Sequence, residues 1–116
     1  ISKIGEEIIL NNVHFSNNSY TLNDSSKFEL NKLSEYLINY KIKINIEGHT
    51  DSNGDSDLNL VLSNNRAKSV YDYMISMGVS QTQMSYSGYG DSRPIAENNT
   101  EEGRAINRRT SFVIID

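Results

Sequence analysis

Residues 41–54 combine an alternating segment with a polar turn, and they restrict the fold more than any other part of the chain. From Lys41 to Glu47 polar and apolar residues alternate strictly, which predicts a strand with one apolar face. Gly48 is expected to end this strand. The polar residues that follow favour a turn, in which Gly54 can adopt a positive φ.

A helix is predicted directly after the turn, from a cap at Ser56 or Asp57 to about Met77. Gly78 is expected to end this helix in a left-handed cap conformation, with Val79 in hydrophobic contact. The residues expected to face the core recur at steps of three and four positions. They are Leu60, Ser63, Ala67, Val70 and Met74.

A second row of residues lies beside the core-facing row of the same helix. Asn59, Leu62 and Arg66 have the same spacing, offset at ~100° per residue, so they are expected at the edge of the buried face. Asp51 in the turn and Arg66, about two helical turns along the helix, would then flank a shallow pocket. Such a pocket suits a ligand with an ammonium and a carboxylate close together. Spacing alone equally allows the two side chains to pair with each other.

The N-terminal part of the chain predicts one strand and one helix. Residues 1–7 are interpreted as a polar lead-in, and residues 8–15 as a first strand, with an interruption at Asn11-Asn12 left open. Ser26 and Glu29 have the spacing of a capping box at the start of a helix that runs to about Asn39. The apolar face of that helix is expected to carry Leu30, Leu33, Leu37 and Tyr40.

The C-terminal part predicts two further strands, a short one at residues 84–88 and a closing one at residues 111–115. The segment 89–100 between them contains the only proline and is expected to be a loop without regular structure. The predicted order is therefore β-α-β-α-β-β. We expect an α/β (α+β) fold in which two main helices pack on one face of a mixed four-stranded sheet.

Composition and charge narrow the possible partners. The 116 residues are 36% hydrophobic and 22% charged, which is typical of one soluble globular domain. The net charge of −4 argues against nucleic acid or an anionic membrane as the main partner, because both bind basic surfaces. No apolar run approaches the ~18 residues of a membrane span, so we expect no membrane insertion of the domain itself. Because the chain starts at Ile1, residues 1–116 are expected to be a single domain excised from a longer protein.

Metal binding has weak support in the sequence. His14 and His49 belong to no zinc-binding spacing and the chain has no cysteine, so no metal or other cofactor is predicted. His49 is expected instead to order the turn by hydrogen bonding to the backbone. Residues 51–57 are similar to part of a calcium loop, but Ser56 and Leu62 stand where that loop needs glycine and a bidentate glutamate. A calcium-stabilised structural module is therefore kept as the alternative function.

Catalysis is not predicted. The chain has no cysteine nucleophile, no Gly-x-Ser-x-Gly turn and no recognisable oxyanion hole, so we expect a protein that is not an enzyme. A basic cluster precedes the closing strand and consists of Arg104, Arg108 and Arg109. It either balances Glu101 and Glu102 or supplies a second guanidinium for a ligand carboxylate, which the planar fork of arginine suits.

Motifs over nearly the whole chain, from about Ile8 to Ile115, are similar to those of one known family. They are Gly48-His49-Thr50-Asp51 with Gly54, then Asn59, Leu62-Ser63 and Arg66-Ala67, and later Gly88-Tyr89-Gly90, Pro94-Ile95-Ala96, Asn98, Thr100, Glu102-Gly103-Arg104-Ala105 and Asn107-Arg108-Arg109. The chain is identified as resembling the C-terminal peptidoglycan-binding domain of outer-membrane protein A. This family includes the peptidoglycan-associated lipoprotein and the flagellar stator protein B.

The resemblance implies non-covalent binding of the peptidoglycan stem peptide, with no nucleic acid partner and no catalytic residue. It assigns the ammonium of diaminopimelate to Asp51 and its carboxylate to Arg66. The other positions that match the pocket are Thr50, Asn59, Leu62, Arg108 and Phe15. It also implies a periplasmic domain that tethers an outer-membrane-associated protein to the cell wall.

The sequence departs from the family pattern at Ser16, where many relatives have aspartate directly after the phenylalanine. If that aspartate helps to hold the ligand, binding is expected to be weaker here, or Asn17 or Asn18 takes its place. The third residue of the stem peptide, the parent protein, its anchor and the oligomeric state stay open.

Overall fold

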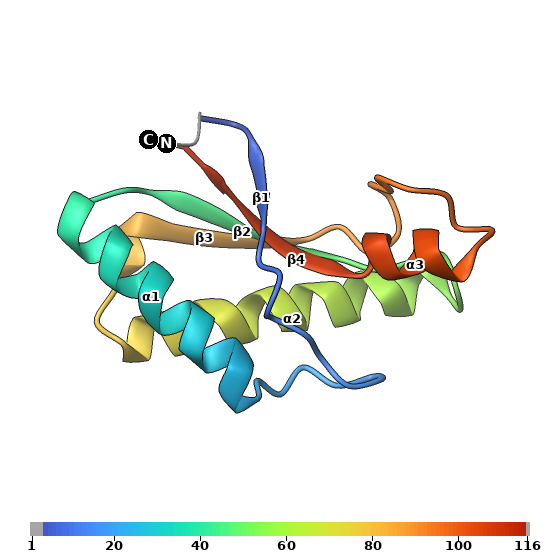
Figure 1. The fold of residues 1–116 in the computed structure, drawn as a ribbon, viewed down its shortest axis with the longest axis horizontal. Coiled ribbons are helices and arrows are strands. Elements are labelled where there is room, and N and C mark those ends of the chain that lie inside the picture. The colour runs from blue at the N-terminus through green and yellow to red at the C-terminus, as the bar shows by residue number, and fades with distance from the viewer. Residues whose placement is uncertain (1–3, 116) are drawn as a thin grey trace.

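The computed structural model describes residues 4–115 and shows α1 and α2 together on one face of a four-stranded sheet (Figure 1). The expected fold class is therefore confirmed. None of the described helices is long and apolar enough to cross a membrane. The elements in chain order are β1 (Glu7–Ile9), α1 (Asp24–Tyr40), β2 (Ile44–His49), α2 (Ser56–Ser76), the 3₁₀ turn η1 (Gln81–Gln83), β3 (Met84–Gly88), α3 (Glu101–Asn107) and β4 (Arg109–Ile114).

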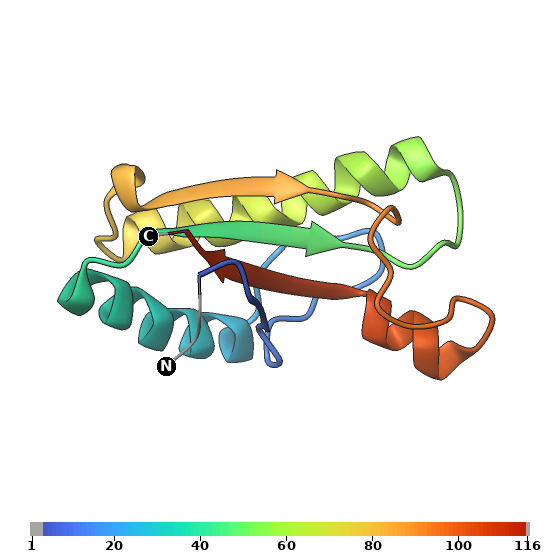
Figure 2. The same ribbon diagram turned by 90° about the horizontal axis from the view of Figure 1, so that it is seen from above.

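The sheet has the strand order β1-β4-β2-β3 (Figure 2). β2 pairs in parallel with β3 and antiparallel with β4, and β4 pairs antiparallel with β1. In the β2–β4 register Ile44 lies opposite Ile114 and His49 opposite Arg109. The turn that leaves the carboxyl end of β2 therefore lies beside the residues that lead into β4.

The core lies between the sheet and the two long helices, and most of the predicted apolar faces are buried there. Leu60 is an exception at 48% exposed, because the helix backbone at that point lies against Gly90 and not against a sheet strand. Tyr40 is 67% exposed; it is the last residue of α1, before the positive-φ cap Lys41, and its ring packs on Tyr36. The largest fully buried apolar side chains are Leu30, Leu37, Ile44, Ile46, Val70 and Met74.

The first helix begins at a different residue from the one predicted. Asn23 is the N-cap of α1, and its side-chain oxygen accepts a hydrogen bond from the Ser26 amide at 2.8 Å. The predicted capping box is therefore wrong. The buried Ser26 hydroxyl donates to the Asn12 carbonyl and accepts from the His14 amide, both at 3.3 Å, and Glu29 accepts from Asn12. These residues anchor the segment after β1 onto α1.

Replacing Asn23 by alanine should lower the free energy of unfolding by about 1 kcal/mol, because the Ser26 amide loses its acceptor. Urea denaturation measures this loss. Ser25→Ala, in the first turn of the same helix, is the matched control and should change stability by less. Equal stability of Asn23→Ala and wild type would contradict the assigned cap.

The second helix begins directly after the polar turn. Gly54 adopts the expected positive φ of 82°. The cap is Asp55 and not Ser56 or Asp57, because the Asp55 carboxylate accepts from the amides of Asp57 and Leu58 at 2.8 and 3.1 Å. The sequence prediction thus placed the cap one or two residues too late.

The end of the second helix agrees with the prediction. Gly78 has a φ of 101°, and the Val79 amide donates to the Met74 carbonyl at 3.1 Å. Val79 is buried and belongs to the core, which is the hydrophobic contact expected of this cap.

The first strand is shorter than predicted. β1 leaves the sheet after Ile9 and a turn follows at Asn11-Asn12, where an interruption was left open. The strand predicted at residues 8–15 is wrong beyond this turn, and Phe15 lies in a coil segment. The lead-in predicted at residues 1–7 is also wrong where it is described, because Ile4 bridges to Ile114 and Glu7 starts β1. Residues 1–3 lie outside the described part.

β2 and β4 both extend toward the cleft described below. β2 starts at Ile44 and ends at His49. It continues past Gly48 because Gly48 and His49 pair with Thr110 and Arg109 at the start of β4. β4 correspondingly begins two residues before the predicted closing strand. The extra pairing fixes the position of the turn after β2.

A close backbone contact holds α2 against the carboxyl ends of β2 and β3. A β-carbon built on Gly88 would lie 2.3 Å from the Asn64 nitrogen, and one on Gly48 would lie 2.3 Å from the Ser63 carbonyl oxygen. Glycine at both strand ends therefore lets the helix approach more closely than any side chain would allow.

The loop at residues 89–100 contains no helix or strand, as predicted, but α3 follows it and was not predicted. Thr100 caps α3 by accepting a hydrogen bond from the Gly103 amide at 3.0 Å. A glycine within a short helix weakens the sequence signal. Figure 2 shows α3 beyond the ends of the strands.

Candidate ligand-binding cleft

A cleft of about 800 Å³ opens at the carboxyl end of β2. Its walls come from the segment after β1, the turn before α2, the first half of α2, and α3 with the start of β4. Every candidate site residue from the sequence lines it, namely Phe15, Thr50, Asp51, Asn59, Leu62, Arg66 and Arg108. The two asparagines considered as substitutes for the missing aspartate, Asn17 and Asn18, also line the cleft.

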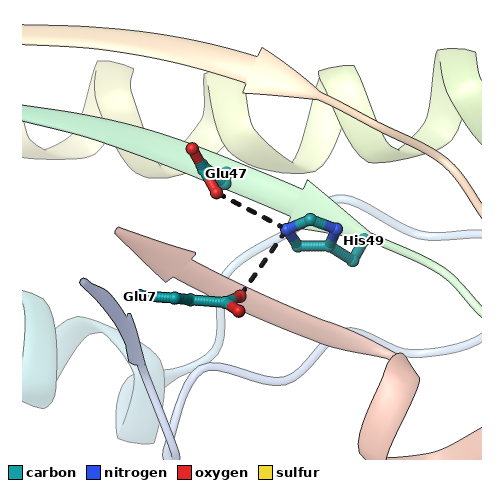
Figure 3. A group of neighbouring side chains, drawn as sticks. All are labelled: Glu7, Glu47 and His49. Carbon is teal, nitrogen blue, oxygen red and sulfur yellow. Dashed lines mark ion pairs between the residues drawn. The ribbon is translucent and has the colours of Figure 1, made fainter. Parts of the chain in front are cut away.

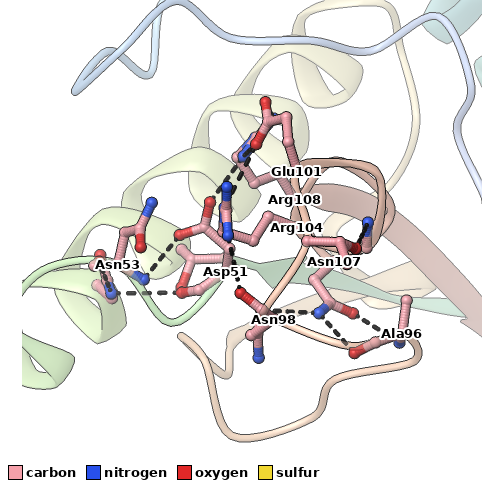
Figure 4. Close-up of polar contacts among 12 residues, drawn as sticks. Asp51, Asn53, Ala96, Asn98, Glu101, Arg104, Asn107 and Arg108 are labelled. Atoms are coloured by element: carbon pink, nitrogen blue, oxygen red, sulfur yellow. Dashed lines mark hydrogen bonds and ion pairs between the residues drawn. The ribbon is translucent and has the colours of Figure 1, made fainter.

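Asp51 is fixed at the base of the turn. Its side chain is 9% exposed, and one carboxylate oxygen, Oδ1, accepts from the Asn53 amide at 3.0 Å. The other, Oδ2, accepts from Arg108 Nη1 at 2.7 Å (Figure 4). The backbone beside it is held because the Thr50 amide donates to the Gly90 carbonyl at 2.8 Å. The carboxylate is thus oriented and largely shielded from water.

Arg108 is shared between two carboxylates. Besides Asp51 it contacts Glu101, with 3.1 Å between Nη2 and Oε2. Hydrogen bonds to Glu101 and to Asp51 raise the pKa of Arg108, and the same contact with Arg108 lowers the pKa of Glu101. Because Glu101 remains as a partner, Arg108 can give up part of its contact with Asp51 when a cationic ligand group binds.

Arg66 faces the same cleft from α2 but does not pair with Asp51, so the alternative of a direct ion pair is wrong. Its Nε donates to the Ser19 carbonyl at 2.8 Å, its Nη2 donates to the Ser16 carbonyl at 3.1 Å, and its guanidinium lies 5.2 Å from the Phe15 ring centroid. Burial lowers the pKa of Arg66, and the charge of Asp51 partly opposes this. Among residues 4–115, Arg66 Nη1 has no hydrogen-bond acceptor. This nitrogen can therefore donate to a ligand.

Asn59 and Thr50 order the turn around the acid. Asn59 Nδ2 donates to the Asn53 carbonyl at 2.8 Å, and the Thr50 hydroxyl donates to the Asp51 carbonyl at 2.8 Å. Leu62, which is partly buried, supplies apolar surface to the cleft wall. These side chains hold the turn in the conformation that presents Asp51.

Asn107 connects α3 to the preceding loop and was not singled out for this role from the sequence. It is fully buried, and its side-chain oxygen accepts from the amides of Ile95 and Ala96 at 2.8 and 3.0 Å. Its Nδ2 donates to the Ala96 carbonyl and to Asn98 Oδ1, both at 2.9 Å (Figure 4). This network fixes α3 and, through it, the position of Arg108.

The members of the predicted basic cluster have different partners. Arg109 is buried and pairs with Glu7 at 2.8 Å, and Arg104 lies 3.4 Å from Glu101. Within the described residues Arg108 is the member of the cluster that contacts Asp51. The alternative of charge balance therefore describes Arg104 and part of the contacts of Arg108, since both pair with Glu101, and Arg108 also reaches Asp51 in the cleft.

The prediction for His49 is wrong. Its ring is buried and stacks on Tyr89 with 5.4 Å between ring centroids, and neither ring nitrogen has a hydrogen-bond partner within residues 4–115. The ring therefore makes no hydrogen bond to the turn backbone. The calcium alternative finds no support either, because both carboxylate oxygens of Asp51 and Oδ1 of Asp55 already accept hydrogen bonds from the turn, the helix cap and Arg108.

The family model for the OmpA family matches residues 14–108, and the chain belongs to this family. It is 39% identical over 98% of its length to the probable lipoprotein YiaD of Escherichia coli, and 38% identical over 89% to the peptidoglycan-associated lipoprotein of Buchnera aphidicola. It spans 54% and 60% of the lengths of these two relatives.

The fold is likewise that of a solved relative. The crystal structure of the peptidoglycan-associated lipoprotein from Burkholderia pseudomallei superimposes with a TM-score of 0.81 at 33% sequence identity. The superposition covers 88% of this chain and 87% of that one. The similarity therefore extends over most of the fold.

Proposed function

We propose that this domain binds the stem peptide of peptidoglycan without covalent chemistry and so tethers its parent protein to the cell wall from the periplasmic side. In this proposal Asp51 binds the free ammonium of diaminopimelate and Arg66 binds the adjacent carboxylate. The observation that carries the proposal is that a shielded carboxylate and a half-buried guanidinium lie in one cleft. Each is held by neighbouring groups, and the two do not pair with each other. Two of the relatives are named peptidoglycan-associated lipoproteins, which supports the same target.

The chemistry of diaminopimelate fits this arrangement. Within a stem peptide its side-chain end carries an ammonium and a carboxylate on one carbon atom. Asp51 can accept from the ammonium, and the free Nη1 of Arg66 can donate to the carboxylate. Charged hydrogen bonds contribute ~1.5–3 kcal/mol each, so one site gives modest affinity. Many copies of the stem peptide along the wall would increase retention through effective concentration.

A comparison of two stem peptides tests the proposal directly. Lysine has the same side-chain ammonium as diaminopimelate but lacks the neighbouring carboxylate. A diaminopimelate tripeptide should bind about 10-fold more tightly than the lysine tripeptide, since one charged contact with Arg66 is lost. NMR titration of the labelled domain measures both affinities and should place the shifts around Asp51 and Arg66. Equal affinities, or shifts located away from the cleft, would refute the proposed ligand.

A further inference from the structure

A second group of polar side chains lies on the sheet face opposite to α1 and α2. His49 Nε2 is 3.7 Å from Glu7 Oε2 and 3.7 Å from Glu47 Oε1 (Figure 3). The possible donor atoms of the three residues all lie within 4.8 Å of one another. The group joins two strands that are not neighbours, because β4 lies between β1 and β2. Folding therefore places Glu7 next to Glu47 and His49.

His49 is the member of this group that demands an explanation. Its side chain is 1% exposed, yet neither ring nitrogen has a hydrogen-bond partner within the described residues. A buried polar group without a partner costs free energy, and buried imidazoles normally donate or accept. The ring nitrogen points between two carboxylates at a distance too long for hydrogen bonds to either (Figure 3). A ligand placed between the three side chains would give His49 Nε2 a partner.

From this geometry we infer that Glu7, Glu47 and His49 form a site for a divalent transition-metal cation such as Zn²⁺. One imidazole and two carboxylates form a donor set that zinc accepts, with water as the fourth ligand. Tetrahedral coordination at about 2.1 Å requires ligand atoms about 3.4 Å apart. The two separations from His49 are 3.7 Å and the one between the carboxylates is within 4.8 Å, so the side chains must move closer together to bind the ion.

The surroundings of the three residues support this assignment. Arg109 and Ser111 donate to Glu7 Oε2 at 2.8 and 2.6 Å, and Asn45 donates to Glu47 at 3.2 Å. Hydrogen bonds of this kind orient carboxylate ligands in metal sites. Arg109 pairs with Glu7, so Glu47 is the carboxylate of the group whose charge remains to attract a cation. Glu7, whose side chain is 27% exposed, leaves a route from solvent.

The protonation state of His49 also suits a ligand. Burial and the nearby charge of Arg109 lower the pKa of His49 to about 4. The imidazole is therefore neutral near pH 7 and has a lone pair available, as metal coordination requires.

Thermal unfolding of the untagged protein after chelator treatment, with and without Zn²⁺, tests the site. Saturating Zn²⁺ should raise the melting temperature of the wild type by about 5 °C, because the metal binds the folded state. Glu47→Gln should lose this increase, since it removes a ligand whose hydrogen-bond partner is a single neutral side chain, Asn45. His14→Gln is the matched control; it removes the exposed histidine and should respond as the wild type does. No increase in the wild type, or an equal increase in Glu47→Gln, would overturn the proposal.

Visible absorption of the Co²⁺-loaded protein provides a second measurement that does not depend on the stability of a variant. Coordination by His49 in a four-coordinate site should give intense ligand-field bands in the wild type and in His14→Gln. Their absence from the wild type would overturn the proposal even if Glu47→Gln failed to fold. Of the three residues His49 lines the cleft, whereas Glu7 and Glu47 do not, so Glu47→Gln tests the metal site without changing a residue of the cleft.

Discussion

Replacing Asp51 by asparagine should weaken the binding of a diaminopimelate stem peptide by about 10- to 100-fold while preserving the fold. The substitution keeps an oxygen that can accept from the Asn53 amide, so the turn is retained. It removes the negative charge that the ligand ammonium needs, and a charged hydrogen bond contributes ~1.5–3 kcal/mol. Arg108 would remain paired with Glu101 but would no longer be neutralised by Asp51. A repulsive cation would then face the ligand ammonium.

The affinity can be measured by titration and by co-sedimentation with purified peptidoglycan. Asp72→Asn is the matched control, because it removes an exposed carboxylate from α2 that pairs with Lys68 away from the cleft. It should leave binding unchanged. Unaltered binding by Asp51→Asn, in a protein with wild-type circular dichroism, would remove Asp51 from the binding site.

Replacing Gly88 by alanine should destabilise the domain by about 3 kcal/mol or more. The new methyl group would lie 2.3 Å from the Asn64 nitrogen and 2.5 Å from the Asn64 α-carbon, both of them backbone atoms of α2. Because backbone atoms cannot rotate away, the helix must move off the sheet, and such overpacking has costs of this size. Urea denaturation measures the change.

Gly54→Ala is the control that distinguishes the effect of the close contact on stability from the effect of replacing a glycine. Gly54 has a positive φ of 82°, but a β-carbon there would meet nothing within 4 Å. Its replacement should cost only about 1–2 kcal/mol, from the left-handed backbone alone. A loss for Gly88→Ala no larger than that for Gly54→Ala would contradict the tight contact between β3 and α2.

The periodic segments were the predictable part of the fold. The alternation before Gly48 and the row from Ser63 to Met74 give the sheet and α2 because burial follows directly from side-chain spacing. The ends of elements were predicted less well. Ser26 and Ser56 look like caps in sequence, yet Asn23 and Asp55 have that role, since several neighbouring polar residues could each serve.

The residues that line the cleft could be predicted where their positions depend on local spacing or on family resemblance. Arg66 was placed at the edge of the buried face from its helical offset, and it lines the cleft. Its actual partners, the Ser16 and Ser19 carbonyls, could not be predicted because they come from a segment nearly 50 residues away. The Glu101–Arg108 contact was one of the two alternatives for the basic cluster, but the helix α3 that positions both residues was not predicted, because Gly103 weakens the helical signal.

The antiparallel pairing of β2 with β4 determines how the domain would carry a pulling force. The cleft follows the carboxyl end of β2, whereas Ile114 at the end of β4 lies opposite Ile44, at the other end of the sheet. Tension between a bound wall peptide and the C-terminal end of β4 would therefore act along both strands. The hydrogen bonds between them would be loaded together in shear and not opened one after another, so the domain would resist extension in this direction best.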